Sequence, residues 1–187
     1  MKKFRFTKNK FDLEQTSSIG IDNEFLCVQL TDGSIIKLRI MDTAGQERFD
    51  SINEKFYKEA DCCLLVYDIT KKKSFKRIKN YYIKKIKENC KNIFKVVLLG
   101  NKTDKNDERE VSEKDGRDLA LKNNYIFMES SCKDNYNVSD AFTALVEMTN
   151  NDMIKEKEKE NNTNNFSLDE TKGETFDNKS NSQKSCC

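Results

Sequence analysis

The chain has 187 residues, with 34 Lys and Arg against 32 Asp and Glu, 6 Gly and no His, Pro or Trp. This length accommodates about one domain and a tail. The absence of His excludes a Ser-His-Asp triad, a Cys-His dyad and a His-ligated metal site. No two glycines have the spacing of the phosphate-binding sequence GxxxxGK[ST], so these residues contain no such loop.

The net charge is +2, and lysines occur along the whole chain, so we expect no concentrated basic face and no nucleic-acid partner. No apolar run reaches the ~18 residues that span a bilayer, which predicts a soluble intracellular chain. In that setting the seven cysteines are expected to be reduced thiols. Five of them adjoin apolar stretches and are expected to be small buried side chains: Cys27, Cys62, Cys63, Cys90 and Cys132.

The first predicted elements form a hairpin. Residues 24–30 and 35–41 are strand-like and flank the turn Thr31-Asp32-Gly33-Ser34, and Asp-Gly between two such runs is a strong hairpin signal. Further along, the near-continuous apolar runs 62–68 and 95–100 are typical of parallel strands covered on both faces. A shorter run, 126–130, predicts a third strand of this kind.

Helical patterns separate these strands. Phe75, Ile78, Tyr82 and Ile86 recur at helical spacing, and so do the apolar residues between 138 and 145, namely Val138, Ala141, Phe142 and Leu145. Ser112 and Asn137 stand where helix N-caps are expected. The alternation predicts an α/β fold with a doubly wound, mostly parallel sheet in three layers.

Composition changes near residue 150. Residues 151–187 hold few apolar side chains among Asn, Lys, Glu, Ser and Thr, too few to offset the entropy of ordering. We therefore expect an ordered domain over 1–150 and a disordered tail over 151–187, with helix able to continue through KEKEKE.

Three polar motifs follow three predicted strands. DTAGQERF occupies 42–49, NKTD occupies 101–104 and SSCK occupies 130–133. Because the carboxyl ends of strands in one sheet meet at the same edge, these motifs are expected to line a single crevice.

Together these motifs resemble the Rab branch of the Ras superfamily of small GTPases. The resemblance includes SSIGID at 17–22, DTAGQE at 42–47, YDIT at 67–70, NKTD, SSCK with Cys132 in place of Ala, and a terminal Cys186-Cys187 pair. It covers about residues 1–149 and implies a small G domain that binds GTP and GDP with Mg²⁺ and hydrolyses GTP slowly. It also implies a switch in vesicle-mediated intracellular transport.

Residue chemistry agrees with the roles that the resemblance implies for the guanine site. The planar carboxylate of Asp104 can accept both the ring and the exocyclic N–H of guanine, which adenine does not offer together. Asn101 and Lys102 would hold that loop and lie along the base and ribose. Ser131, with the backbone of Cys132 and Lys133, would close the other side. NKTD by itself is also a common capping and turn sequence.

The resemblance assigns further positions by role. Ser18 and Asp42 match the magnesium-holding positions, Gly45 the amide that senses the third phosphate, and Gln46 the residue that orients the attacking water. The implied partners are effector, exchange and GTPase-activating proteins. Apolar residues of the two switches are expected to form an order-dependent effector surface, although some could be ordinary core or edge residues: Ile19, Gly20, Ile21, Phe25, Phe49, Phe56 and Tyr57.

The terminal Cys186-Cys187 pair resembles the ending that receives two geranylgeranyl groups, and two lipid chains give stable anchoring. This implies a lipid-anchored protein on the cytoplasmic face of an endomembrane that cycles with the cytosol. The tail is slightly acidic, with 8 Asp and Glu against 6 Lys over 151–187, so it offers no polybasic assistance.

The chain departs from the Rab pattern at its beginning. Arg5-Phe6 fits the end of the first family helix, so Met1 falls just after the place of GK[ST]. Without the phosphate loop, nucleotide and Mg²⁺ binding, and with them GTPase activity, are expected to be weakened or lost. The absent first strand would leave a gap of ~9.6 Å between strands 35–41 and 62–68, with two unpaired edges, so we do not expect the chain to fold stably as written.

Two explanations of this departure remain open. The sequence can be a truncated reading of a longer gene for an ordinary Rab. Alternatively, it can be a phosphate-loop-deficient pseudo-GTPase that acts as a prenylated binding module without a nucleotide cycle. The retained Gln46 favours the first, because a binding module has no physical need for a water-positioning side chain.

Overall fold

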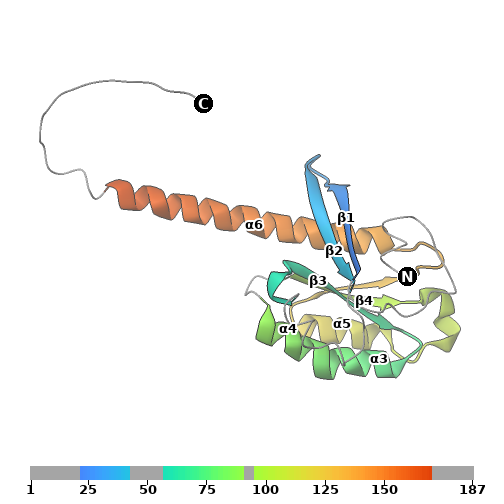
Figure 1. The fold of residues 1–187 in the computed structure, drawn as a ribbon. Coiled ribbons are helices and arrows are strands. Elements are labelled where there is room, and N and C mark those ends of the chain that lie inside the picture. Colours follow the sequence, from blue (N-terminus) through green and yellow to red (C-terminus); the bar gives the residue numbers. More distant parts are fainter. Residues whose placement is uncertain (1–21, 43–56, 91–94, 170–187) are drawn as a thin grey trace, which may run out of the picture. The chain divides into compact units, whose positions relative to one another are not determined.

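The computed structural model describes residues 22–42, 57–90 and 95–169 of the chain, with side chains as far as Lys159 (Figure 1). The chain divides into two units, Met1–Asn151 and Asp152–Cys187, which are described separately.

The first described element is the hairpin. Strands β1 (Asp22–Gln29) and β2 (Ile35–Asp42) pair antiparallel, with Val28 opposite Ile36. The turn is closed by the amide of Gly33 donating to the Leu30 carbonyl at 3.0 Å, and Gly33 has a φ of +84°. Asp32 Oδ1 accepts the Ser34 amide at 2.9 Å, which fixes the turn from within. The hairpin predicted from the sequence is thus confirmed, with each strand end within two residues of the expected position.

The parallel sheet consists of β3 (Cys62–Asp68), β4 (Lys95–Asn101) and β5 (Ile126–Ser130), in the order β3-β4-β5. Residues 96–100 of the central strand are all buried, as a strand covered on both faces requires. This confirms the α/β fold class predicted from the sequence.

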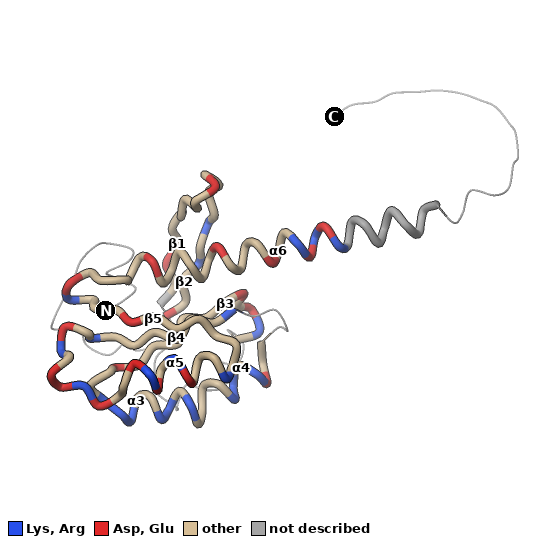
Figure 2. The backbone as a smooth tube through the Cα atoms, turned by 180° about the vertical axis from the view of Figure 1, so that it is seen from behind, with Lys and Arg blue, Asp and Glu red and all other residues tan. Residues whose placement is uncertain are grey.

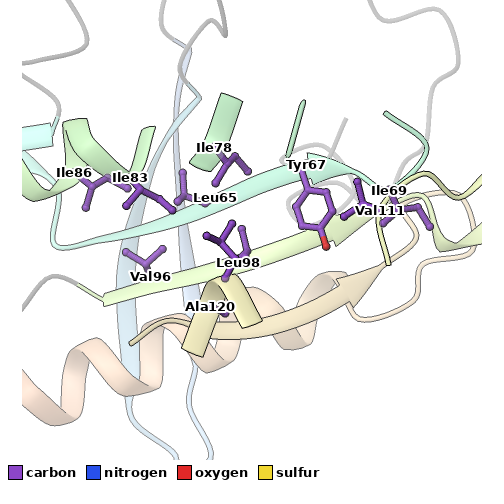
Figure 3. Close-up of a cluster of buried hydrophobic side chains, with 11 residues drawn as sticks. Leu65, Tyr67, Ile69, Ile78, Ile83, Ile86, Val96, Leu98, Val111 and Ala120 are labelled. Atoms are coloured by element: carbon purple, nitrogen blue, oxygen red, sulfur yellow. The ribbon is translucent and has the colours of Figure 1, made fainter. Parts of the chain in front are cut away.

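Helices cover both faces of this sheet (Figure 1). On one face lie α3 (Lys72–Arg77), the π-turn η2 (Ile78–Tyr82), α4 (Ile83–Asn89) and α5 (Glu113–Lys122). Their apolar side chains surround Leu65, Tyr67 and Leu98 (Figure 3). On the other face, the start of α6 (Val138–Asp169) places Ala141 and Leu145 against Val97 and Leu99.

The helix after β3 differs in register from the sequence-based expectation. At the π-turn the amide of Ile83 donates to the Ile78 carbonyl, five residues earlier. The extra residue rotates the second half of the helix, so Ile83 becomes 6% exposed while Tyr82 is only partly buried. The predicted stripe of Phe75, Ile78, Tyr82 and Ile86 does pack in or against the core, and Ile83 is a further buried residue that the helical spacing did not predict.

Helix ends and cysteines give mixed outcomes. Ser112 caps α5, because its hydroxyl accepts the Asp115 amide at 3.1 Å. Asn137 precedes α6 with a φ of +54°, and its side-chain amide donates to the Glu129 carbonyl at 3.0 Å.

Cys132 is buried as expected, whereas Cys27 is exposed because it lies on the outward face of β1.

The hairpin and the parallel sheet are separate sheets among the described residues, and β2 exchanges no ladder hydrogen bonds with β3. Side chains connect them instead. Ile40 of β2 and Leu64 of β3 pack on the same cluster, whose members are Cys132, Val138 and Phe142. Nearer the turn, Val28 and Leu30 pack with Val146 of α6.

The second unit begins within α6, which stays helical as far as Asp169. The helix therefore continues through KEKEKE, as the sequence allowed, and beyond it. Over the described part of the chain, no helix is both long and apolar enough to cross a membrane.

Candidate functional site

The carboxyl ends of the three parallel strands place polar residues side by side. The register sets Asp68 opposite Asn101, and Asn101 opposite Ser130. The hydroxyl of Ser130 donates to Asn101 Oδ1 at 3.2 Å, and the amide of Ile69 donates to the Asn101 carbonyl at 3.0 Å. Asn101 thus joins all three strand ends.

Asp104 stands at the start of the short helix η3 (Thr103–Glu108), directly after this edge. Its Oδ1 accepts the hydroxyl of Ser131 at 2.7 Å, and the same hydroxyl oxygen accepts the amide of Asp134 at 3.0 Å. Within the described ranges, Asp104 Oδ2 has no hydrogen-bond partner. One carboxylate oxygen is therefore fixed, and the other is available to a donor from a ligand.

Lys102 is held in a strained loop conformation. Its backbone is left-handed, with φ +76° and ψ +40°, which costs energy for a residue with a Cβ. The ammonium Nζ lies 2.7 Å from Asp68 Oδ2. Asp68 Oδ1 in turn accepts the amide and the hydroxyl of Thr70, at 3.0 and 2.7 Å. The loop is thus anchored to the end of β3.

Asp68 has an altered acidity. Burial alone would raise its pKa, but the hydrogen bonds from Lys102 and Thr70 stabilise the carboxylate and lower the pKa below the usual value. Asp68 belongs to the YDIT motif, but no role was predicted for it from the sequence. Its position offered a signal, because an acid at the end of the predicted strand 62–68 must lie level with the end of strand 95–100.

The loop after β5 is well ordered by internal contacts. Ser131 and Tyr136 form an antiparallel bridge with backbone hydrogen bonds of 3.1 and 2.9 Å. Ser131 is 1% and Cys132 is 2% exposed, and Cys132 packs against Val138 and Phe142. Lys133 is exposed. The loop therefore presents backbone and a lysine side chain beside Asp104, rather than the Cys132 thiol.

The other candidate residues belong to other elements or lie outside the described residues. Asp42 ends β2 and is half-buried, Phe25 is 60% exposed on β1, and Tyr57 is half-buried. The rest of the predicted site falls where the structure gives no description: Ser18, Ile19, Gly20, Ile21, Gly45, Gln46, Phe49, Phe56, Cys186 and Cys187.

The described residues fit a guanine base. A base with adjacent ring and exocyclic donors matches a carboxylate that has an unsatisfied oxygen, and Asp104 has one. For Mg²⁺, which prefers oxygen ligands, Asp42 supplies a suitable carboxylate type, and Ser18 lies outside the described residues. Among the described residues, no three or more His, Cys, Asp or Glu side chains are arranged so that they could hold a metal ion.

Comparison with known proteins agrees with this geometry. The Ras family profile matches residues 3–151. Ras-related protein Rab-8A of Bos taurus and of Mus musculus is 46% identical over 142 residues, and Rab-8B of Homo sapiens is 45% identical over the same length. Each alignment covers 76% of this chain and 68% of the relative.

The domain is a Ras-like G domain. It has a parallel sheet with helices on both faces, polar residues gather at the carboxyl ends of its strands, and its sequence matches the Ras family. The chain belongs to the Ras family and, with these relatives, is a Rab-type small GTPase of the Ras superfamily. Membership implies in general the binding of guanine nucleotide with Mg²⁺, and partners that regulate or respond to it. Nothing in these comparisons supports the pseudo-GTPase alternative.

Proposed function

We propose that the protein is a Rab-type GTP-binding switch that regulates vesicle-mediated transport and hydrolyses GTP slowly to GDP. The observation that carries the proposal is the Asp104 carboxylate in a loop at the carboxyl edge of the sheet, fixed through Oδ1 by Ser131 and without a partner at Oδ2 among the described residues. This is the arrangement that a guanine-selective site needs.

In the proposed site, each group of residues binds a different part of the nucleotide or its metal ion. Asp104 accepts the guanine donors, Asn101 and Lys102 hold the loop and flank the base, and Ser131, Cys132 and Lys133 close the far side. Asp42 and Ser18 hold Mg²⁺, which neutralises phosphate charge when bound. Gly45 approaches the third phosphate through its backbone, and Gln46 positions water for hydrolysis.

The proposed effector surface centres on the two switches. Phe25 supports it, because an aromatic side chain 60% exposed on a strand face is available to a partner rather than to the core. Lys37 Nζ lies 5.6 Å from the centre of the Phe25 ring, so this surface is both apolar and cationic. Its other members are Ile19, Gly20, Ile21, Phe49, Phe56 and Tyr57.

We further propose that Cys186 and Cys187 carry geranylgeranyl groups that anchor the protein to the cytoplasmic face of an endomembrane. Two lipid chains supply stable anchoring where one gives only marginal binding. Exchange proteins, GTPase-activating proteins and effectors would act on the anchored form.

Nucleotide selectivity tests the proposal. For the 187-residue chain we expect GDP and guanosine to bind in preference to ADP and adenosine, and Asp104→Asn to weaken guanine binding by roughly 10⁴-fold, as for a lost buried pairing. Because these residues contain no GxxxxGK[ST] loop, we expect GDP to exceed guanosine only modestly, which marks weakened phosphate and Mg²⁺ contacts.

Calorimetric titration measures these affinities, with Asp107→Asn as an exposed control on the same short helix. Equal affinity for guanine and adenine nucleotides would sink the proposal. A GDP affinity far above that of guanosine would show that other residues hold the phosphates.

A further inference from the structure

Positive charge concentrates on one helical segment. Residues 71–87 contain nine Lys and Arg and no Asp or Glu, although the net charge of the whole chain is only +2. The other residues are therefore net negative together. This concentration differs from the even spread of lysines expected in the sequence analysis.

The fold turns most of these charges toward solvent. Ile78, Ile83 and Ile86 point into the core beneath α3, η2 and α4, so the lysines occupy the opposite side (Figure 3). Figure 2 shows Lys and Arg recurring along α3 and α4, whereas α5 carries both signs. We call the exposed set the α3–α4 basic face: Lys71, Lys72, Lys73, Lys76, Lys79, Lys84 and Lys87.

Several of these charges have no partner of opposite sign among the described residues, in contrast to the arginine on α5. On the α3–α4 basic face, Lys84 lies 3.7 Å from Glu88, whereas Lys73, Lys76 and Lys87 form no ion pair with any described residue. On α5, by contrast, Arg117 donates to Glu113 one turn earlier. Like charges three and four residues apart destabilise a helix, so the fold retains an electrostatic cost on this face.

Lysine predominates over arginine in this segment, which favours a partner with many spread-out negative charges over one that is read through specific paired contacts. Lysine is a mobile point charge, whereas the guanidinium of Arg forms the planar paired contacts used to read nucleic-acid bases. The one guanidinium in the segment, Arg77, lies over the rings of Tyr81 and Tyr82, 6.0 and 5.5 Å from their centres. Tyrosines beside lysines are typical of side chains at a membrane interface.

We propose that the α3–α4 basic face binds the surface of a membrane that contains anionic phospholipid. A cluster of four to eight lysines on a helix is sufficient for such attraction, and each lysine near the surface raises binding by about fivefold. The interaction goes beyond the proposed switch function and requires neither nucleotide nor lipid anchors.

Vesicle co-sedimentation of the full, unlipidated chain tests this proposal. The basic-face variant is Lys73→Gln, Lys76→Gln, Lys87→Gln. The control variant removes the same charge from exposed helical positions elsewhere: Lys122→Gln, Lys155→Gln, Lys157→Gln. Circular dichroism and guanosine binding, measured on all three proteins, report separately on the fold and on the nucleotide site.

We expect the unchanged chain and the control to bind phosphatidylserine-containing vesicles and not phosphatidylcholine alone. We expect the basic-face variant to bind about 100-fold more weakly. Binding should fall as ionic strength approaches about 1 M, where screening acts within ~3 Å. Equal binding by the basic-face and control variants would overturn the proposal. The proposal would also be overturned if the unchanged chain bound duplex DNA or polyglutamate more tightly than the vesicles and the basic-face variant lost that binding.

Discussion

Asp68 shows how a single residue orders the candidate site. It binds Lys102 through Oδ2 and Thr70 through Oδ1, so the strained left-handed backbone at Lys102 is held at the end of β3. The hydrogen bonds outweigh burial and lower the pKa of the carboxyl, which means that the folded state prefers the ionised form. A lowered folded-state pKa stabilises the fold above the unfolded pKa and loses that contribution as pH falls.

Asp68→Asn is therefore expected to reduce the free energy of unfolding at pH 7 by about 1.5–3 kcal/mol, the usual contribution of a hydrogen bond to a charged group. The difference in stability between the two proteins should shrink as pH falls below about 4, because Asp68 then becomes protonated and its carboxyl is as uncharged as the Asn side chain. Urea unfolding at pH 7, 5 and 3 measures this, with Asp107→Asn as the exposed control. A deficit that stays constant across this pH range would show that shape, not charge, matters at Asp68.

At the scale of elements, the hairpin and three parallel strands were predictable because alternation and apolar runs report local geometry directly. The π-turn was not, because the regular helical spacing of the apolar residues does not show that Ile83, next to Tyr82, also turns into the core. In the site, NKTD and SSCK pointed to Asp104 and Ser131, whereas the Asp68–Lys102 pair depends on the register between strands.

Gly116 is an element-scale example in which packing opposes helix propensity. Glycine inside α5 costs about 1 kcal/mol relative to alanine. A Cβ at Gly116, however, would lie 2.6 Å from Tyr67 Oη and would overlap the ring of Phe127. Tyr67 cannot easily move away, because it is 2% exposed and surrounded by the core.

We accordingly expect Gly116→Ala to destabilise the protein by about 1–3 kcal/mol, the usual effect of overpacking. Urea unfolding would measure the change. Asp118→Ala, on the exposed side of the same helix, should stay within about 0.5 kcal/mol of the unchanged protein. If Gly116→Ala proved more stable, the strand–helix contact would have to be looser than it is in the structure.

At the scale of the whole domain, the hairpin and the parallel sheet are linked by side chains and by few polar contacts. Between β2 and β3 there are no ladder hydrogen bonds among the described residues. The hairpin instead rests on α6, through Val146 and through a hydrogen bond of 3.2 Å from the Thr31 amide to Glu147. Because no ladder joins the two sheets among the described residues and the shared cluster is small, we expect the hairpin to be the less stable part.

Substitution of Phe142 tests whether the hairpin is less stable than the parallel sheet. Phe142 belongs to the cluster that Ile40 of the hairpin and Leu64 of the sheet both contact. Phe142→Ala should cost about 3–5 kcal/mol of global stability, as expected for a buried aromatic. In native-state hydrogen exchange, amides of β1 and β2 should lose more protection than those of β4. Leu145→Ala is the matched control, since Leu145 packs on Val97 and Leu99, and it should affect β4 more than the hairpin. Equal loss of protection in the hairpin and β4 after Phe142→Ala would contradict this division, and would mean that the two sheets unfold as one unit through contacts other than the shared cluster.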